Sequence, residues 1–293
     1  MSRYSIKELE KLSGIKAHTI RIWEKRYNVI QPKRTQTNIR YYSEHDLKKL
    51  LNIAILNREG WRISNISKLN HHELTEKVMK STYNSRDLES QIEKLVIAMV
   101  ELDETKFDQI LSNAIMHEGF EQTIIKLIFP FLARIGLLWQ TGSINPAQEH
   151  FISNLLRQKI MVAIDNLRIP DRKDAKTFIL FLPEEEFHEL GLLFYNYLIK
   201  KAGQNVIYLG SSVPFNDLVE TTQLIKCDYL FAAITTALNG NQLKRYIEQL
   251  SDKFSRQIIF ITGMKIHEAE FSLPGNVEKV SSPSEIQERL KSI

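Results

Sequence analysis

The apolar positions near the amino terminus recur at the spacing of two short helices. Ser5 is a good N-cap for the first helix, and Gly14 tolerates the left-handed conformation that commonly ends one. The second helix is expected over residues 17–26, with Ile20 and Trp23 on its inner face and a polar, basic outer face. Two short helices joined by a glycine-containing turn are typical of a helix-turn-helix, whose second helix enters the major groove of DNA.

A polar stretch after Pro32 leads to a third helix, which Ser43 and Asp46 begin as a capping box. A basic loop or short hairpin at this place, beside a recognition helix, predicts a wing. Charge and periodicity alone fit a small helical domain with a solvated basic face equally well. We expect this amino-terminal domain over residues 1–75, and the polar tract over residues 76–87 predicts a linker.

The rest of the chain changes from helical spacing to strand-like runs near Pro170. Residues 88–168 have apolar helical spacing without strand alternation, which predicts a bundle of four helices. Over residues 174–293, short apolar runs alternate with helix-length segments, which predicts a flavodoxin-like (Rossmann-like) parallel sheet covered on both faces. The predicted fold class is therefore multidomain, α and α/β. The expected strands are residues 177–183, 205–210, 229–235 and 257–263.

Positive charge is concentrated in the amino-terminal domain. The first forty residues hold ten Lys/Arg and three Asp/Glu, a balance of +7, whereas the remaining 253 hold 29 and 32, a balance of −3. Clustered basic residues neutralise phosphates, so this asymmetry favours a nucleic-acid partner. The single cysteine, Cys227, excludes an intramolecular disulfide and a metal site built from cysteines. No apolar run approaches the roughly 18 residues of a membrane span, so we expect a cytoplasmic protein without a membrane partner.

The second helix and the segment after it carry a specific motif. Residues 19–27 read T-x-R-x-W-E-x-R-Y, followed by Pro32, Arg34, Asn38, Arg40 and Tyr41. This pattern closely resembles the MerR family of winged-helix transcription regulators. The resemblance implies a dimer or higher oligomer on a two-fold, double-stranded DNA operator, with Trp23 and Tyr27 packing the domain. The residues that it implies contact DNA, mainly its phosphates, are Thr19, Arg21, Arg34 and Arg40.

The segment after the first expected strand carries a candidate ligand. In parallel sheets ligands bind at the carboxyl ends of the strands, and that position here reads P-E-E-E-F-H-E-L-G over residues 183–191. It contains neither G-x-G-x-x-G nor G-x-x-x-x-G-K-[ST], which argues against a dinucleotide site and a P-loop. His188 stands three residues before Gly191. By itself, a loop histidine of this kind is more often solvated or capping than a ligand.

The spacing around His188 resembles the D-x-H-x-x-G signature of cobalamin-binding domains, with Glu186 at the Asp position and Gly191 at the Gly position. The resemblance implies that His188 ligates the lower face of cobalt. A carboxylate two residues earlier can hydrogen-bond the other imidazole nitrogen and fix its tautomer, and Glu186 can do this with one more methylene.

Two further positions of that family differ in this chain. The Ser-x-Leu that follows the third strand falls around residues 232–233, without its serine, and the Gly-Gly after the fourth strand is Thr262-Gly263. In the family both elements line the slot for the nucleotide tail of the cofactor. Thr235 and Thr236 can supply substitute hydroxyls.

The helical middle carries a third motif. Trp139, Glu149 and His150 form a W-x9-E-H pattern. It resembles the helical cap of the light-sensing, cobalamin-dependent MerR-type repressors of bacterial carotenoid genes. The resemblance implies adenosylcobalamin as the cofactor, with Trp139 against its adenosyl group and His150 reaching cobalt after photolysis. It further implies a repressor, not an enzyme, whose dark DNA-binding tetramer comes apart in light.

Two other interpretations stay open. A cofactor-free regulator would use the altered sheet domain only for dimerisation or for binding an antirepressor protein. A corrinoid carrier for methyl transfer would share the His188 pattern, but nothing in such a carrier needs the basic winged helix.

Overall fold

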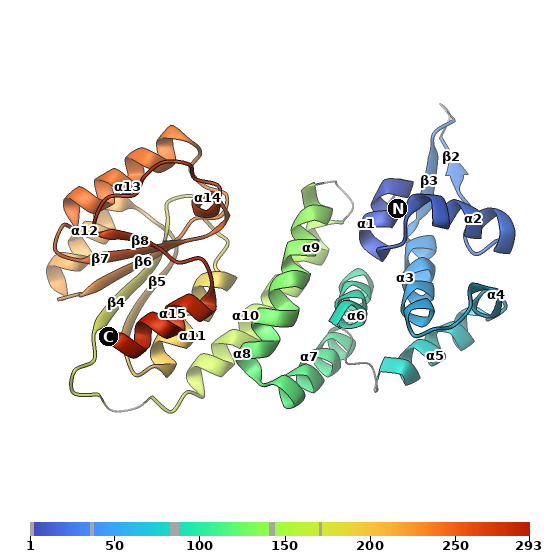
Figure 1. Ribbon diagram of the computed structural model, residues 1–293, viewed down its shortest axis with the longest axis horizontal. Helices are drawn as coiled ribbons and strands as arrows, with labels where there is room; N and C mark the ends of the chain where they lie inside the picture. The colour runs from blue at the N-terminus through green and yellow to red at the C-terminus, as the bar shows by residue number, and fades with distance from the viewer. Residues whose placement is uncertain (1–2, 36–37, 83–87, 141–143, 170–171) are drawn as a thin grey trace. The chain divides into compact units, whose positions relative to one another are not determined.

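The computed structural model describes residues 3–35, 38–82, 88–140, 144–169 and 172–293 (Figure 1). The chain divides into two compact units, Met1–Ile152 and Ser153–Ile293. Within the described ranges, no helix is long and apolar enough to cross a membrane.

The first unit begins with two short helices, and local sequence signals set their ends. Ser5 and Glu8 form a capping box at the start of α1, and Gly14 ends that helix in the left-handed conformation, with φ 69°. Ser43 and Asp46 form the second predicted capping box, at the start of α3. The predicted helix-turn-helix and both predicted caps are therefore confirmed. Its elements are β1 (Arg3–Tyr4), α1 (Ile6–Ser13), α2 (Ala17–Tyr27), β2 (Lys33–Arg34), β3 (Arg40–Ser43), α3 (Glu44–Arg58) and α4 (Ile63–Ile66).

The predicted wing is an antiparallel hairpin of β2 and β3, and β1 pairs with the other edge of β3. Tyr42 of β3 is buried, and its hydroxyl donates to Glu24 Oε2 of α2 at 3.0 Å. Burial, together with the neighbouring Glu24 carboxylate, raises the pKa of Tyr42 to about 12, so its hydroxyl stays a hydrogen-bond donor. This bond ties the hairpin to α2. Ile20 and Trp23 of α2 are buried, as predicted.

The polar tract expected to be a linker differs from the prediction. Helix α5 (His71–Thr82) includes residues 76–82, while residues 83–87 lie outside the described ranges. Asn70 and Glu73 cap this helix reciprocally, with two hydrogen bonds of 2.9 Å. Leu74 and Val78, one helical turn apart, are buried, and α5 packs against α3. Burial of this apolar pair stabilises a helix here despite the polar composition of the tract.

The described residues between 88 and 169 form four helical stretches, as predicted. These are α6 (Leu88–Glu101), α7 (Glu104–Glu118), the continuous α8 (Phe120–Thr123), η1 (Ile124–Ile128) and α9 (Phe129–Gln140), and α10 (Pro146–Asp165). In η1 the bonds widen to the π pattern, and the Phe129 N–H donates to Ile124 O. Pro130 lies just beyond. Because proline lacks an N–H and its ring clashes with the carbonyl four residues earlier, the wider turn lets the helix continue through it.

The second unit holds a five-stranded parallel sheet in the order β5-β4-β6-β7-β8. Four strands lie where they are predicted, and the fifth, β8, is an addition. Helices α12 and α13 cover one face of the sheet, and α11 and α15 cover the other (Figure 1). This order is the flavodoxin-like one, in which ligands bind where the strand order reverses, at the carboxyl ends of β4 and β6. The elements are β4 (Thr177–Pro183), α11 (Leu190–Lys201), β5 (Asn205–Val213), α12 (Phe215–Leu224), β6 (Tyr229–Ala233), α13 (Asn241–Lys253), β7 (Ile258–Thr262), α14 (Met264–His267), β8 (Val277–Lys279) and α15 (Pro283–Ser292).

Candidate functional site

Two loops meet at the carboxyl edge of the sheet, one after β4 and one after β6, and a buried carboxylate joins them. Glu186 of the first loop is 0 % exposed. Its Oε2 accepts from the backbone N–H groups of Thr235, Thr236 and Ala237 at 2.8, 2.7 and 3.0 Å. Burial by itself raises the pKa of Glu186, but the hydrogen bonds from His188 and from these three amides outweigh it and hold the pKa well below the ordinary value. The carboxylate is therefore a fixed negative charge.

The imidazole of His188 lies against this charge. Its Nδ1 is 2.6 Å from Glu186 Oε1, and the side chain is 57 % exposed. Because an ionised carboxylate only accepts, Nδ1 carries a proton. In the neutral imidazole this leaves the lone pair on Nε2, which is the form that ligates a metal. The Thr236 hydroxyl lies 3.1 Å from the same Nδ1. The contact expected from the two-residue spacing is thus present, and the longer Glu side chain makes it.

Two glycines at this edge have different surroundings. Gly191 is the second residue of α11, and a Cβ there would meet no heavy atom within 4 Å. The packing of the described residues therefore leaves room against the start of this helix. Gly263 has φ +106°, and a Cβ there would lie 2.3 Å from Ile234 O. Gly263 is thus required by the close approach of the segments that follow β6 and β7.

Two threonine hydroxyls near the strand ends, those of Thr262 and Thr236, bond to other groups of the protein. Thr262 is buried, and its hydroxyl donates to Val280 O at 2.8 Å. The Thr236 hydroxyl donates to Glu186 Oε1 at 3.3 Å. Thr235 contributes its backbone N–H to Glu186. Sequence reasoning missed Ala237, which contributes only a backbone amide and carries no side-chain signal.

The residues predicted in the helical cap belong to the first unit. Trp139 lies in α9, and its side chain lies outside the described residues. Glu149 and His150 are adjacent on α10, with Glu149 Oε2 3.3 Å from His150 Nδ1. The His150 side chain is 73 % exposed, which leaves its ring accessible in this unit.

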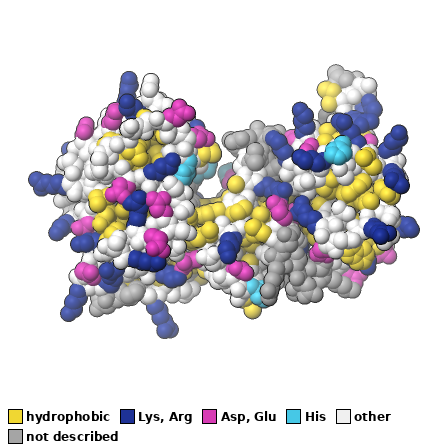
Figure 2. All heavy atoms as spheres, in the orientation of Figure 1, with side chains coloured by type: hydrophobic (Ala, Val, Ile, Leu, Met, Phe, Trp, Pro, Cys, Tyr) yellow, Lys and Arg dark blue, Asp and Glu magenta, His cyan; other side chains and the backbone are white. Residues whose placement is uncertain are grey.

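The four predicted DNA contacts lie on α2 and the hairpin. Arg21 is exposed on α2, and Thr19 is half-buried. Arg34 and Arg40 are directly opposite each other in the pairing of β2 and β3, and both are exposed. Lys and Arg side chains gather around these elements in Figure 2. Exposed Ile22 of α2, absent from the predicted set, stands next to Arg21 with 52 % of its surface exposed.

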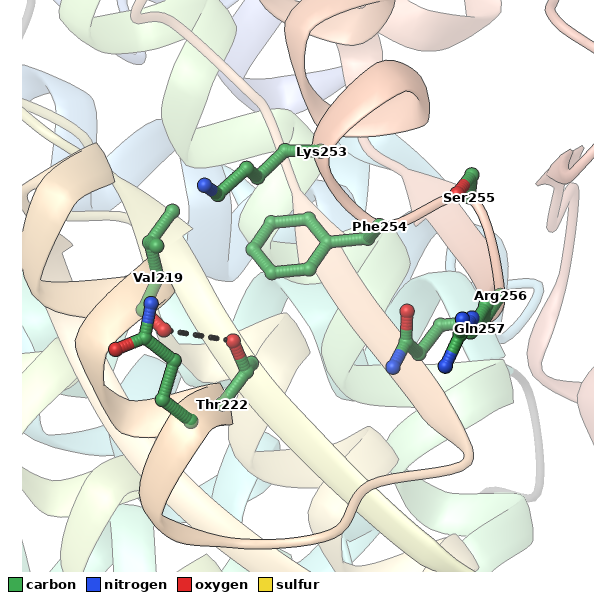
Figure 3. A pocket seen from close by; sticks show the side chains of 8 residues that line it. Val219, Thr222, Lys253, Phe254, Ser255, Arg256 and Gln257 are labelled. Atoms are coloured by element: carbon green, nitrogen blue, oxygen red, sulfur yellow. Dashed lines mark hydrogen bonds between the residues drawn. The ribbon is translucent and has the colours of Figure 1, made fainter.

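A pocket at the opposite edge of the sheet is separate from this site. It has a volume of about 240 Å³ and is formed by the end of α12 and by the segment that joins α13 to β7 (Figure 3). That segment precedes β7, so the pocket lies at the amino ends of the strands. It holds Lys253 and Arg256 but none of the predicted site residues.

Comparisons with known proteins match the amino-terminal and the helical parts of the chain to protein families. Residues 4–73 match the MerR HTH family regulatory protein model, and residues 91–163 match a B12 binding domain model. The HTH-type transcriptional repressor CarH of Myxococcus xanthus is 26% identical over 259 residues, 86% of each chain. The repressor CarA of the same organism is 24% identical over 211 residues, 71% of this chain and 68% of its own.

A solved structure shares the fold of the helical and sheet regions. The monomethylamine corrinoid protein of Methanosarcina barkeri superposes with a TM-score of 0.54 at 16% identity, over 71% of this chain and 100% of its own. This likeness supports the flavodoxin-like assignment of the sheet. The chain therefore joins a MerR-type helix-turn-helix domain to a B12 binding domain.

Proposed function

We propose that this protein is a cobalamin-dependent transcriptional repressor. The observation that carries the proposal is the Glu186–His188 pair at the carboxyl edge of the sheet, in a chain that also presents a basic winged helix-turn-helix. The similarity to CarH and CarA, which are named as repressors, supports the same function and supports none of the enzymatic alternatives.

The residues at the sheet edge fit a corrinoid. His188 Nε2 would hold the cobalt, while Glu186 holds the Nδ1 proton and so fixes the imidazole. The open space beside Gly191 would admit the cofactor against the start of α11. Adenosylcobalamin, the form that the resemblance to light-sensing repressors implies, supplies a cobalt–carbon bond that light can cleave.

The DNA-binding part would act through α2 and the hairpin. Arg21 would enter the major groove with α2, and Arg34 and Arg40 would contact phosphates from the hairpin. Thr19, at the start of α2, would add a hydroxyl contact to the backbone of the operator. Two copies would bind the two halves of the operator, because helix-turn-helix proteins commonly pair on half-sites.

Regulation would act through assembly. In the dark, Trp139 would lie against the adenosyl group, and Glu149 and His150 would complete the helical cap of a DNA-binding tetramer. Once the cobalt–carbon bond is cleaved by light, this contact would be lost and the tetramer would come apart, and His150 would be available to hold the cobalt. Such coupling requires only that the intact cofactor favours one quaternary state over the other.

One observation favours a second candidate, a cofactor-free regulator. Thr262 stands at the first position of the Gly-Gly element, and its hydroxyl is already bonded to Val280 O in the protein interior. In this alternative the sheet domain would serve dimerisation or bind an antirepressor protein.

A visible absorption spectrum separates the two candidates. The protein is incubated with adenosylcobalamin in the dark, freed of excess cofactor and measured beside His188→Ala and the control His117→Ala, which alters an exposed histidine of α7. The first proposal expects wild type and control to retain an imidazole-ligated corrinoid and His188→Ala to lose that spectrum. A wild type that retains no corrinoid supports the cofactor-free regulator instead.

A further inference from the structure

Four ionisable side chains from three helices form a cluster inside the first unit, where the helical region meets the helix-turn-helix. Arg58 ends α3, Glu89 and Glu93 lie on α6, and Arg134 lies on α9. Arg58 Nη2 is 2.8 Å from Glu93 Oε1, and Arg58 Nη1 is 3.8 Å from Glu89 Oε2. Arg134 Nη1 donates to the same Glu89 oxygen at 3.1 Å. We call these four residues the Arg58 cluster.

The Arg58 cluster contacts the turn that precedes the recognition helix. Arg58 Nη2 donates to Ser13 O, the last carbonyl of α1, at 3.4 Å. A Cβ on Gly14 would lie 2.8 Å from Arg58 Nη2 and 3.8 Å from Arg134 Nη2. Glycine at this turn therefore serves two needs, the left-handed φ and the close approach of the Arg58 guanidinium. A cation at the carboxyl end of α1 is also favoured by the helix dipole.

Two members of the cluster, Glu93 and Arg134, are largely buried. Glu93 is 0 % exposed, and the Arg134 side chain is only 17 % exposed. A buried polar side chain that loses its partner costs stability whether it is ionised or protonated, so Glu93 restricts where Arg58 can lie. Contacts of this kind hold one defined arrangement of α1, α3, α6 and α9.

Helix α9 connects the cluster to the region that matches the B12 binding domain. Residues 91–163 match that model, and α9 lies within them. Arg134 precedes Trp139 by five residues on this one helix, about 7.5 Å along its axis. A shift of α9 that moves Trp139 therefore also moves Arg134 relative to Glu89 and Gly14.

We propose that Arg58 and Arg134 are positioning residues, which hold the turn before the recognition helix and transmit the cofactor state of the helical region to DNA binding. The second half of this statement rests on the proposed function. The first half concerns the cofactor-free protein and stands by itself.

The test uses the full chain and three variants, Arg134→Met, Arg134→Lys and Lys126→Met. Lys126 lies on the same helical stretch and pairs with Glu118 at 3.7 Å, so its variant removes an ion pair away from the helix-turn-helix. Amide hydrogen exchange over residues 14–20 is measured without cofactor or DNA. Affinity for a duplex selected by the wild type from a random-sequence pool is measured in the dark, with and without adenosylcobalamin.

We expect Arg134→Met to speed exchange over residues 14–20 about tenfold, and to reduce the cofactor-dependent change in duplex affinity about fivefold. Arg134→Lys should restore both to within about twofold, because it keeps a cation opposite Glu89. Lys126→Met should leave both as in the wild type. A purely structural role would lower duplex affinity equally with and without adenosylcobalamin, and so would leave the cofactor-dependent change as in the wild type.

Unchanged exchange in Arg134→Met, or an equal effect of Lys126→Met, overturns the positioning role. If Arg134→Met does not fold, Glu89→Gln removes the same link from a side chain that is 56 % exposed, and the same direction of change is expected. A wild type whose duplex affinity ignores adenosylcobalamin overturns the proposed function, while the exchange measurement still decides the role of Arg134.

Discussion

At residue 186, one buried charge is held by a side chain and by the backbone of a distant loop. Replacing Glu186 by Gln keeps its size but removes the charge that His188 Nδ1 and three amides face. We expect the free energy of unfolding to fall by about 2–4 kcal/mol. Affinity for adenosylcobalamin should fall about 10–100-fold, because the imidazole tautomer is no longer fixed. Denaturant titration and absorption measure the two effects, and Glu185→Gln, an exposed neighbour, should change neither.

Glu93 is expected to make the free energy of unfolding depend on pH. Burial raises the pKa of Glu93 to about 8 from 4.5, against the nearby Arg58 and Arg134 guanidinium groups, which lower it. The folded protein therefore keeps this proton over a pH range in which the unfolded chain loses it. The contribution to stability is full below about pH 4.5 and is lost as the pH rises through 8. Unfolding measured between pH 5 and 9 should show this decline, and Glu93→Gln should flatten it. An equal slope in the variant would contradict the assignment.

The residues of the candidate site show which contacts can be predicted from the sequence and which cannot. The Glu186–His188 contact follows from a two-residue spacing, because both side chains leave one loop. The amide donors of Thr235 and Ala237 cannot be predicted in this way, because every residue except proline has a backbone N–H and their loop lies far from Glu186 in the sequence. The Arg58 cluster is likewise invisible in the sequence, because three separate helices bring its members together.

The recognition helix and the hairpin act as elements, and their arginines can be tested one by one. We expect Arg21→Gln, Arg34→Gln and Arg40→Gln each to weaken binding to the selected duplex. Each lost phosphate contact should lower the slope of log affinity against log salt by about one. Arg21→Gln should also alter base preference, because α2 carries it toward the groove. Arg172→Gln, an arginine of the second unit, is the control. Unchanged slopes in all three variants would exclude the DNA-binding role of this face.

Elements with strong local signals are predictable, and those without them are not. The capping boxes at α1 and α3 and the apolar runs of β4 to β7 are written in a few adjacent residues. Strand β8 spans three residues, Val277–Lys279, of which only one is apolar, so its pairing with β7 depends on the sheet already being formed. Helix α5 was hidden by polar composition, although the Asn70–Glu73 cap and the pair Leu74 and Val78 signal it.

The order of the domains along the chain fits a DNA-binding protein that is controlled by a bound cofactor. A basic DNA-binding domain precedes a B12 binding domain, and both the Arg58 cluster and α9 provide a physical connection between them within the first unit. Assembly between copies depends on contact surfaces that the spacing of residues in the sequence does not predict. The expected boundaries at 1–75, 88–168 and 174–293 stay predictions, since α10 passes from the first compact unit into the second.

The last prediction concerns light and assembly. Trp139→Ala should reduce dark, cofactor-dependent assembly without abolishing cobalamin binding, because the lower ligand His188 remains. His150→Ala should leave dark assembly and photolysis largely intact but destabilise the illuminated product, because cobalt then lacks a second imidazole. Size-exclusion chromatography before and after green light, on the wild type and both variants, measures these differences. A wild type that binds adenosylcobalamin but elutes identically in both conditions would rule out the photoreceptor mechanism while leaving cobalamin-dependent repression intact.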